Sequence, residues 1–216
     1  AIKNYKSFVW FFFKAGISIA GLVWAYSKTD IEAINDLLYS AELFWLLPPV
    51  FLYVASKWVS ALRLNSFFSN VGTNVSLRQG VLLYWLGMFY NLFLPGGIGG
   101  DAYKVLLLKK HLQASWKKNT SAVLYDRISG MMALLILSTL LLMYRPVFDL
   151  FWVGLTGCIL LIPVYIFFTR FFFPDFIPGL WKGFFLSLIV QALQVMAAWS
   201  IFHAMHVHDH LPELML

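Results

Sequence analysis

A proline and four glycines stand directly before a carboxylate in the segment from Asn91 to Asp101. The segment follows an apolar run, residues 81–94, in a chain that is apolar nearly throughout. Glycine and proline both interrupt helices, and irregular backbone at membrane depth needs surrounding protein or a water-filled cavity. Amides at a helix start favour an anion, carbonyls at a helix end favour a cation, and glycines let a ligand approach the backbone. The candidate binding residues here are Pro95, Gly96, Gly97, Gly99, Gly100 and Asp101.

The alternative for this segment is a tight turn that packs two helices together. Gly96 and Gly100 fit the small-xxx-small spacing of closely packed helices. Pro95 and the density of glycines argue against one continuous helix and favour a broken-helix site.

A second pair of charges, Asp126-Arg127, lies in an apolar run predicted to begin near Thr120. A charge in hydrocarbon costs at least about 2.5–3.5 kcal/mol, and neighbouring helical residues point about 100° apart, so the two need not pair with each other. Asp126 shares a face with Gly130 and Ala133, which would aim its carboxylate at a neighbouring helix. Arg127 is a candidate phosphate ligand. If the helix begins later than Thr120, the pair instead lies near the head groups.

Ser187, Gln191, Gln194 and Ala198 form a polar face on a further apolar run. Gln191 and Gln194 are candidate substrate contacts, and interhelical hydrogen bonding is the alternative. The histidines near the C-terminal end lack the spacing of a known metal motif, so neither a metal nor a cofactor is predicted.

The composition is that of a helical membrane protein. Of 216 residues, 61% are hydrophobic and only 12% are charged, against about 25% in a soluble domain. The net charge of +6 is attributed to basic cytoplasmic loops, so no nucleic-acid partner is predicted. No P-loop or nucleophile-elbow motif is present, and the loops are too short for a soluble catalytic domain, which argues against an enzyme.

Spans of roughly 20 apolar residues cross a bilayer as helices. The predicted spans are 8–26, 43–62, 120–144, 150–169 and 183–203, and a sixth apolar segment, 79–94, is short.

Basic residues predict the topology of these spans. Lys3 and Lys6 place the N-terminus in the cytoplasm, and Arg63 and Arg78 follow the second span on the same side. A full crossing of 79–94 would put the densest lysine cluster, at 104–118, outside. That conflict disappears if the chain turns at 95–100 and returns through 101–108. The predicted fold is therefore an all-α polytopic transmembrane helix bundle, a single domain over 1–216, with a re-entrant or broken-helix hairpin at about 79–108. It is expected in the cell (inner) membrane.

The run from Tyr90 to Lys104, with Asn91 opening an N-x-F-L-P-G-G-x-G-G-D pattern, resembles a stretch of the lysylphosphatidylglycerol synthase transmembrane (flippase-like) family. The residues from Tyr125 to Gly130 are similar to a second family feature, an acidic-Arg pair that opens a span. The resemblance adds Asn91 and Lys104 to the candidate site. Family members usually continue through further spans, so the chain is expected to lack the C-terminal spans.

The resemblance implies an integral membrane protein that binds a lipid or polyprenyl-linked glycolipid head group and translocates it between leaflets. The implied partner is an anionic phospholipid or a polyprenyl-phosphate-linked lipid, and a lipid-modifying enzyme is a further candidate partner. Two alternatives stay open: an intramembrane transferase that uses Asp101 or Asp126 as acid or base, and a non-catalytic scaffold for a partner glycosyltransferase or synthase.

Overall fold

The computed structural model describes residues 42–93, 99–143 and 148–205, together with residues 16, 19–21, 23, 24, 26, 27 and 39. The chain divides into two compact units, Ala1–Ala41 and Glu42–Leu216. The described residues of the first unit are helical, and most of the predicted span 8–26 lies outside the described residues. The second unit carries the candidate site.

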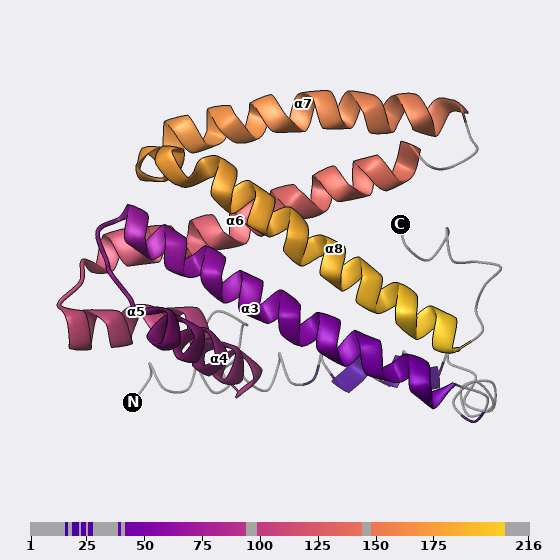
Figure 1. Cartoon of the computed structure of the whole chain (residues 1–216), viewed down its shortest axis with the longest axis horizontal. Coiled ribbons are helices and arrows are strands. Elements are labelled where there is room, and N and C mark those ends of the chain that lie inside the picture. Colours follow the sequence, from indigo (N-terminus) through magenta and orange to yellow (C-terminus); the bar gives the residue numbers. More distant parts are fainter. Residues whose placement is uncertain are drawn as a thin grey trace. The chain divides into compact units, whose positions relative to one another are not determined.

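Every regular element in the described part of the second unit is a helix (Figure 1). The elements are η1 (Leu43–Leu46), α3 (Leu47–Asn70), α4 (Leu77–Phe93), α5 (Gly99–Leu112), α6 (Trp116–Met143), α7 (Phe148–Phe172), η2 (Pro174–Gly179) and α8 (Leu180–Ala204). Four segments are long and apolar enough to cross a membrane: Phe44–Asn70, Trp116–Met143, Phe151–Phe172 and Pro174–Ala204. The predicted all-α polytopic bundle is confirmed.

Helix α3 is longer than the sequence pattern predicted. The prediction ended the second span at residue 62 and put Arg63 in the loop that follows, whereas α3 continues to Asn70. The extension is held by its apolar side chains, because Leu64, Phe67 and Phe68 are fully buried in the core. Arg63 therefore lies inside the helix, about two turns from its end, and not in a loop.

Helices α3 and α8 lie side by side and antiparallel (Figure 1). The Ser200 hydroxyl near the end of α8 donates to the Trp45 carbonyl at 3.1 Å, and the Glu42 amide donates to the Ala204 carbonyl at 3.0 Å. Helix α6 packs against both α3 and α8, and α7 packs mainly on α6. Three helices thus converge where α3 ends and α6 and α8 begin.

Helices α4 and α5 form an antiparallel pair that starts and returns at this same end. They hold 17 and 14 residues, or about 25 and 21 Å, which is shorter than the roughly 30 Å hydrocarbon core. Gly100 packs so closely on Gly87 that a Cβ at Gly100 would meet the Gly87 carbonyl oxygen. The predicted hairpin is present as two short helices, and its turn, residues 94–98, lies outside the described residues.

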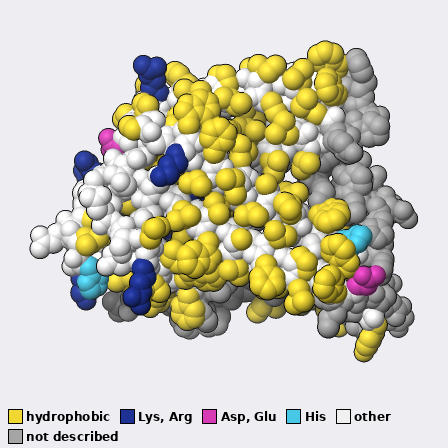
Figure 2. Space-filling view, in the orientation of Figure 1, with side chains coloured by type: hydrophobic (Ala, Val, Ile, Leu, Met, Phe, Trp, Pro, Cys, Tyr) yellow, Lys and Arg dark blue, Asp and Glu magenta, His cyan; other side chains and the backbone are white. Residues whose placement is uncertain are grey.

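Basic side chains gather at this end of the second unit, which we call the basic end. Figure 2 shows dark blue side chains there and a broad apolar surface over the middle of the visible face. The chain order agrees, because basic residues lie at the starts of α4, α6 and α8 and at the ends of α5 and α7. They are Arg78, Lys109, Lys110, Lys117, Lys118, Arg170 and Lys182.

Candidate functional site

A charged cavity of about 230 Å³ lies between α3, α4, α5 and α6. Three cations and two carboxylates line it, which gives a formal charge of +1. Its lining residues are Arg63, Tyr84, Met88, Asn91, Asp101, Lys104, Val123, Asp126, Arg127 and Gly130. Because α3 and α6 are long enough to span a membrane, charges placed here must be paired or serve a function.

The first ion pair joins α3 to α6. The Arg63 Nε donates to Asp126 Oδ1 at 2.8 Å, and the residues are only 5% and 9% exposed. A second Arg63 nitrogen donates to the Ser187 hydroxyl of α8 at 2.8 Å, and this hydroxyl in turn donates to the Gly183 carbonyl. Removing one partner would leave a buried charge uncompensated, so the pair fixes three helices relative to one another.

The sequence correctly aimed Asp126 at a neighbouring helix through its shared face with Gly130. The Arg63 guanidinium lies directly against Gly130, 3.5 Å from where a Cβ would stand. Helix α6 begins at Trp116, earlier than predicted, so Asp126 lies nearly three turns inside the helix. Asp126 is therefore a buried residue of the helix interior and not an exposed residue at the helix start.

The second group of charges is centred on Asp101, in the first turn of α5. Its two oxygens take different partners: Oδ1 accepts from Lys104 Nζ at 2.9 Å, and Oδ2 accepts from Arg127 Nε at 2.6 Å. The Lys104 ammonium also lies over the Tyr84 ring, 4.9 Å from its centroid. Lys104 is 5% exposed, whereas the Arg127 side chain is 46% exposed. Arg127 is thus the most exposed of the three cations that line this cavity.

Asn91 closes the start of α5. Its Oδ1 accepts a hydrogen bond from the Gly100 amide at 2.8 Å, which satisfies one of the free amides at that helix start. The sequence predicted that these amides would be available to an anion; the Gly100 amide is taken by Asn91. Gly100 itself serves close helix packing, as the alternative interpretation expected.

An aromatic cluster closes the core beside Asp126, at the basic end of the bundle. Tyr125, the neighbour of Asp126, stacks on Phe176 with ring centroids 4.5 Å apart, and Phe67 packs edge-on against it at 4.9 Å. The Tyr125 and Tyr165 hydroxyls share a hydrogen bond of 2.8 Å. All four rings are buried, and Phe176 brings η2 into this packed layer.

An apolar pocket of about 180 Å³ adjoins the charged cavity. The two share Asp101, Val123 and Arg127 in their walls, and the apolar pocket is otherwise lined mainly by carbon, including Val105 and Leu124. A ligand with a charged part and a hydrocarbon part could therefore occupy both at once.

The structure brings together five of the predicted residues: Asn91, Asp101, Lys104, Asp126 and Arg127. Gly99 is half-buried at the start of α5. Pro95, Gly96 and Gly97 lie outside the described residues.

The two glutamines of α8 differ from each other. The Gln191 amide donates to the Gly130 carbonyl at 3.1 Å, which is the interhelical hydrogen bond of the alternative interpretation. Gln194 is half-buried and is not among the residues that line the charged cavity.

Sequence reasoning missed Arg63 and Tyr84 as lining residues. For Arg63 the sequence did contain a signal. Phe67, four residues later, lies on the same helix face and continues the apolar pattern beyond the charge. For Tyr84 no signal pointed to a cation on the facing helix.

These features define a polytopic helical membrane protein with paired charges buried inside the bundle. The chain belongs to the family described as the lysylphosphatidylglycerol synthase TM region, whose model matches residues 11–178. A UPF0104 membrane protein of Pyrococcus horikoshii is 29% identical over 116 residues, which cover 53% of this chain and 35% of that relative. The chain thus matches about a third of that relative's length. No solved structure matches the chain.

Proposed function

We propose that the charged cavity binds the phosphate-bearing head group of a membrane lipid and that the chain helps this head group cross the bilayer. The observation that carries the proposal is the convergence of Arg63, Lys104 and Arg127, from three helices, on one cavity of about 230 Å³. Guanidinium and ammonium groups bind phosphate through charge-assisted hydrogen bonds. The formal excess of one cation favours a monoanionic head group such as a phosphodiester.

A lipid fits this site better than a free anion. The apolar pocket shares Asp101 and Arg127 with the charged cavity, so a hydrocarbon chain can lie beside the head group. Arg127, partly exposed, joins the two. The family membership agrees with a lipid as ligand.

The transferase alternative is less well supported by the geometry. Such an enzyme needs a carboxylate within reach of a reacting group as acid or base. Asp126 is held by Arg63, and both oxygens of Asp101 are held by cations. Neither Asp101 nor Asp126 is therefore an unpaired carboxylate that could act as a base, and the paired charges suit binding better than catalysis.

Arg127→Gln is expected to lower retention of the bound lipid about tenfold and to leave the fold intact. One charge-assisted hydrogen bond accounts for a change of this size, taken at the low end because Arg127 is partly exposed. The measurement is native mass spectrometry of the full chain purified in mild detergent, with a titrated anionic phospholipid. Lys117→Gln, an exposed lysine on the same helix, is the control. Equal retention in all three proteins would sink the proposal.

We also propose that the basic end faces the cytoplasm, in accord with the positive-inside rule, and that the α4–α5 hairpin enters and leaves the cell membrane from that side. In a Cys158→Ser background, a cysteine at Arg78 or Lys110 is expected to react with an impermeant maleimide only after cells are permeabilised. A cysteine at Glu42 is expected to react in intact cells. Labelling of positions 78 and 110 from opposite sides would contradict the re-entrant hairpin.

A further inference from the structure

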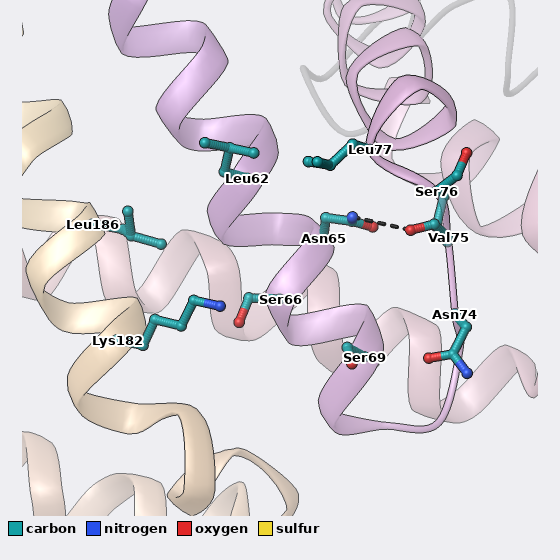
Figure 3. A pocket seen from close by; sticks show the side chains of 10 residues that line it. All are labelled: Leu62, Asn65, Ser66, Ser69, Asn74, Val75, Ser76, Leu77, Lys182 and Leu186. Carbon is teal, nitrogen blue, oxygen red and sulfur yellow. Dashed lines mark hydrogen bonds between the residues drawn. The ribbon is translucent and has the colours of Figure 1, made fainter.

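A second cavity, of about 540 Å³, lies at the basic end between the last turns of α3, the loop of residues 71–76 and the start of α8. Figure 3 shows its lining side chains. None of its lining residues lines the charged cavity or the apolar pocket beside that cavity. Apart from Val75, none of them belongs to the hydrophobic core. It is a separate site.

The leucines of the lining gather at one end of the cavity. Leu62, Leu77 and Leu186 lie at that end together with Asn65 and Ser76, whereas Ser69, Asn74 and Lys182 lie at the other end, with Ser66 between them (Figure 3). Ser69 is about two turns closer than Leu62 to the end of α3. The end with the leucines therefore lies deeper in the bundle, and the end with Lys182 lies where the helices finish. An amphiphile standing in the leaflet at the basic end has the same order of polarity.

The wall of this cavity is fixed before any ligand arrives. The Asn65 Nδ2 donates to the Val75 carbonyl at 3.0 Å and holds the loop on α3. Ser76 and Gln79 form reciprocal hydrogen bonds at the start of α4, a capping box. A preformed wall reduces the conformational entropy that binding would cost.

The electrostatics of this cavity favour an anion. Lys182 is its one charged lining residue, and in the part of the chain that the structure describes it takes part in no salt bridge. Its side chain extends toward Ser66 and Ser69 in Figure 3. An ammonium beside serine hydroxyls and asparagine amides offers several donors to phosphate oxygens and to head-group hydroxyls.

We propose that this cavity binds the phosphate head group of an anionic phospholipid from the leaflet at the basic end. Lys182 binds the phosphate, the serines bind head-group hydroxyls, and Leu62 and Leu186 contact the hydrocarbon nearest the glycerol. The proposal goes beyond the function proposed above because it requires no transport. A free inorganic phosphate shares the head-group chemistry, and the leucines distinguish the lipid from it.

The test measures binding of phosphatidylglycerol and phosphatidylcholine to the full chain in mild detergent by native mass spectrometry. Lys182→Gln is expected to weaken the binding of one of the two phosphatidylglycerol molecules about tenfold, to leave the other at the charged cavity, and to leave phosphatidylcholine binding unchanged. Lys182→Arg keeps the positive charge and is expected to retain phosphatidylglycerol binding. Lys117→Gln, which removes a lysine at the same end, is the control. Ser66→Phe, which fills the cavity without changing its charge, is expected to lower binding as well.

Two further experiments distinguish a lipid from free phosphate and this cavity from the charged cavity. Inorganic phosphate at tens of millimolar is expected to displace less than half of the lipid; full displacement would overturn the lipid assignment in favour of free phosphate. The Lys182→Gln effect is expected to persist in an Arg127→Gln background, so that the two sites fail independently. Unchanged phosphatidylglycerol binding in both Lys182→Gln and Ser66→Phe would overturn the proposal.

Discussion

Arg63→Met is expected to lower the free energy of unfolding by about 3–5 kcal/mol, the range found when one partner of a buried ion pair is removed. The variant leaves the Asp126 carboxylate buried inside the bundle without its cation, although Met fills a similar volume. It also removes the donor to Ser187. The measurement is thermal unfolding of the purified protein in detergent and in nanodiscs. Arg78→Met, an exposed arginine at the start of α4, is the control and is expected to change little.

The double variant Arg63→Met/Asp126→Leu tests whether the pair itself matters. Because both charges are gone, most of the lost stability is expected to return, as when a buried ion pair is replaced by apolar side chains. The double variant is nevertheless expected to bind the lipid head group weakly, since Arg63 lines the charged cavity. An Arg63→Met protein as stable as the wild type would contradict a stabilising role for the Arg63–Asp126 pair.

The helices and their general order could be predicted from the sequence because long apolar runs have few alternatives in a membrane. The paired helices α4 and α5 were also predictable, because two separate signals agreed: the glycine-proline break and the lysines that follow it. The end of α3 was not, because Arg63 was interpreted as a loop charge. A single arginine is compatible with a loop or with a buried pair, and only its partner decides between them.

The partners of the charges could not be predicted from the sequence. Asp126 pairs with a residue 63 positions away and Arg127 with one 26 positions away, and no local spacing encodes such contacts. The helix face of Asp126 was predictable from its spacing to Gly130, so the direction of the carboxylate was correct although its partner was unknown. For Asn91 the sequence motif identified the residue but not its role. Its hydrogen bond with the Gly100 amide depends on how the hairpin closes.

Asp101→Asn is expected to separate lipid binding from lipid transport. Asp101 holds Lys104 and Arg127 at 2.9 and 2.6 Å, and the amide keeps the shape of the side chain but not its charge. The formal charge of the cavity rises from +1 to +2, so retention of a phosphate-bearing lipid is expected to increase several-fold. Transport in proteoliposomes is expected to fall at least tenfold, because a tightly held ligand leaves slowly. Asp175→Asn, an exposed carboxylate on η2, is the control.

The sign of the retention change identifies the head group. An anionic head group competes with Asp101 for the same two cations, so removing the carboxylate strengthens binding. A cationic head group, such as an aminoacyl ester, would need the carboxylate, so the same variant would weaken binding; that outcome would contradict a phosphate as the bound group.

If the chain moves lipid as proposed, the same competition would give the hairpin a role in transport. The Asp101–Arg127 pair ties the start of α5 to α6, and a phosphate that takes over Arg127 breaks this tie. Binding would then favour a state in which α4 and α5 are free to shift against α6, as a ligand does when it binds one conformation more tightly than another. In Asp101→Asn the tie is already weakened without ligand, so the α5 start is expected to exchange amide hydrogens faster and to respond little to added lipid. A wild-type hairpin whose exchange is unchanged by lipid would contradict this coupling.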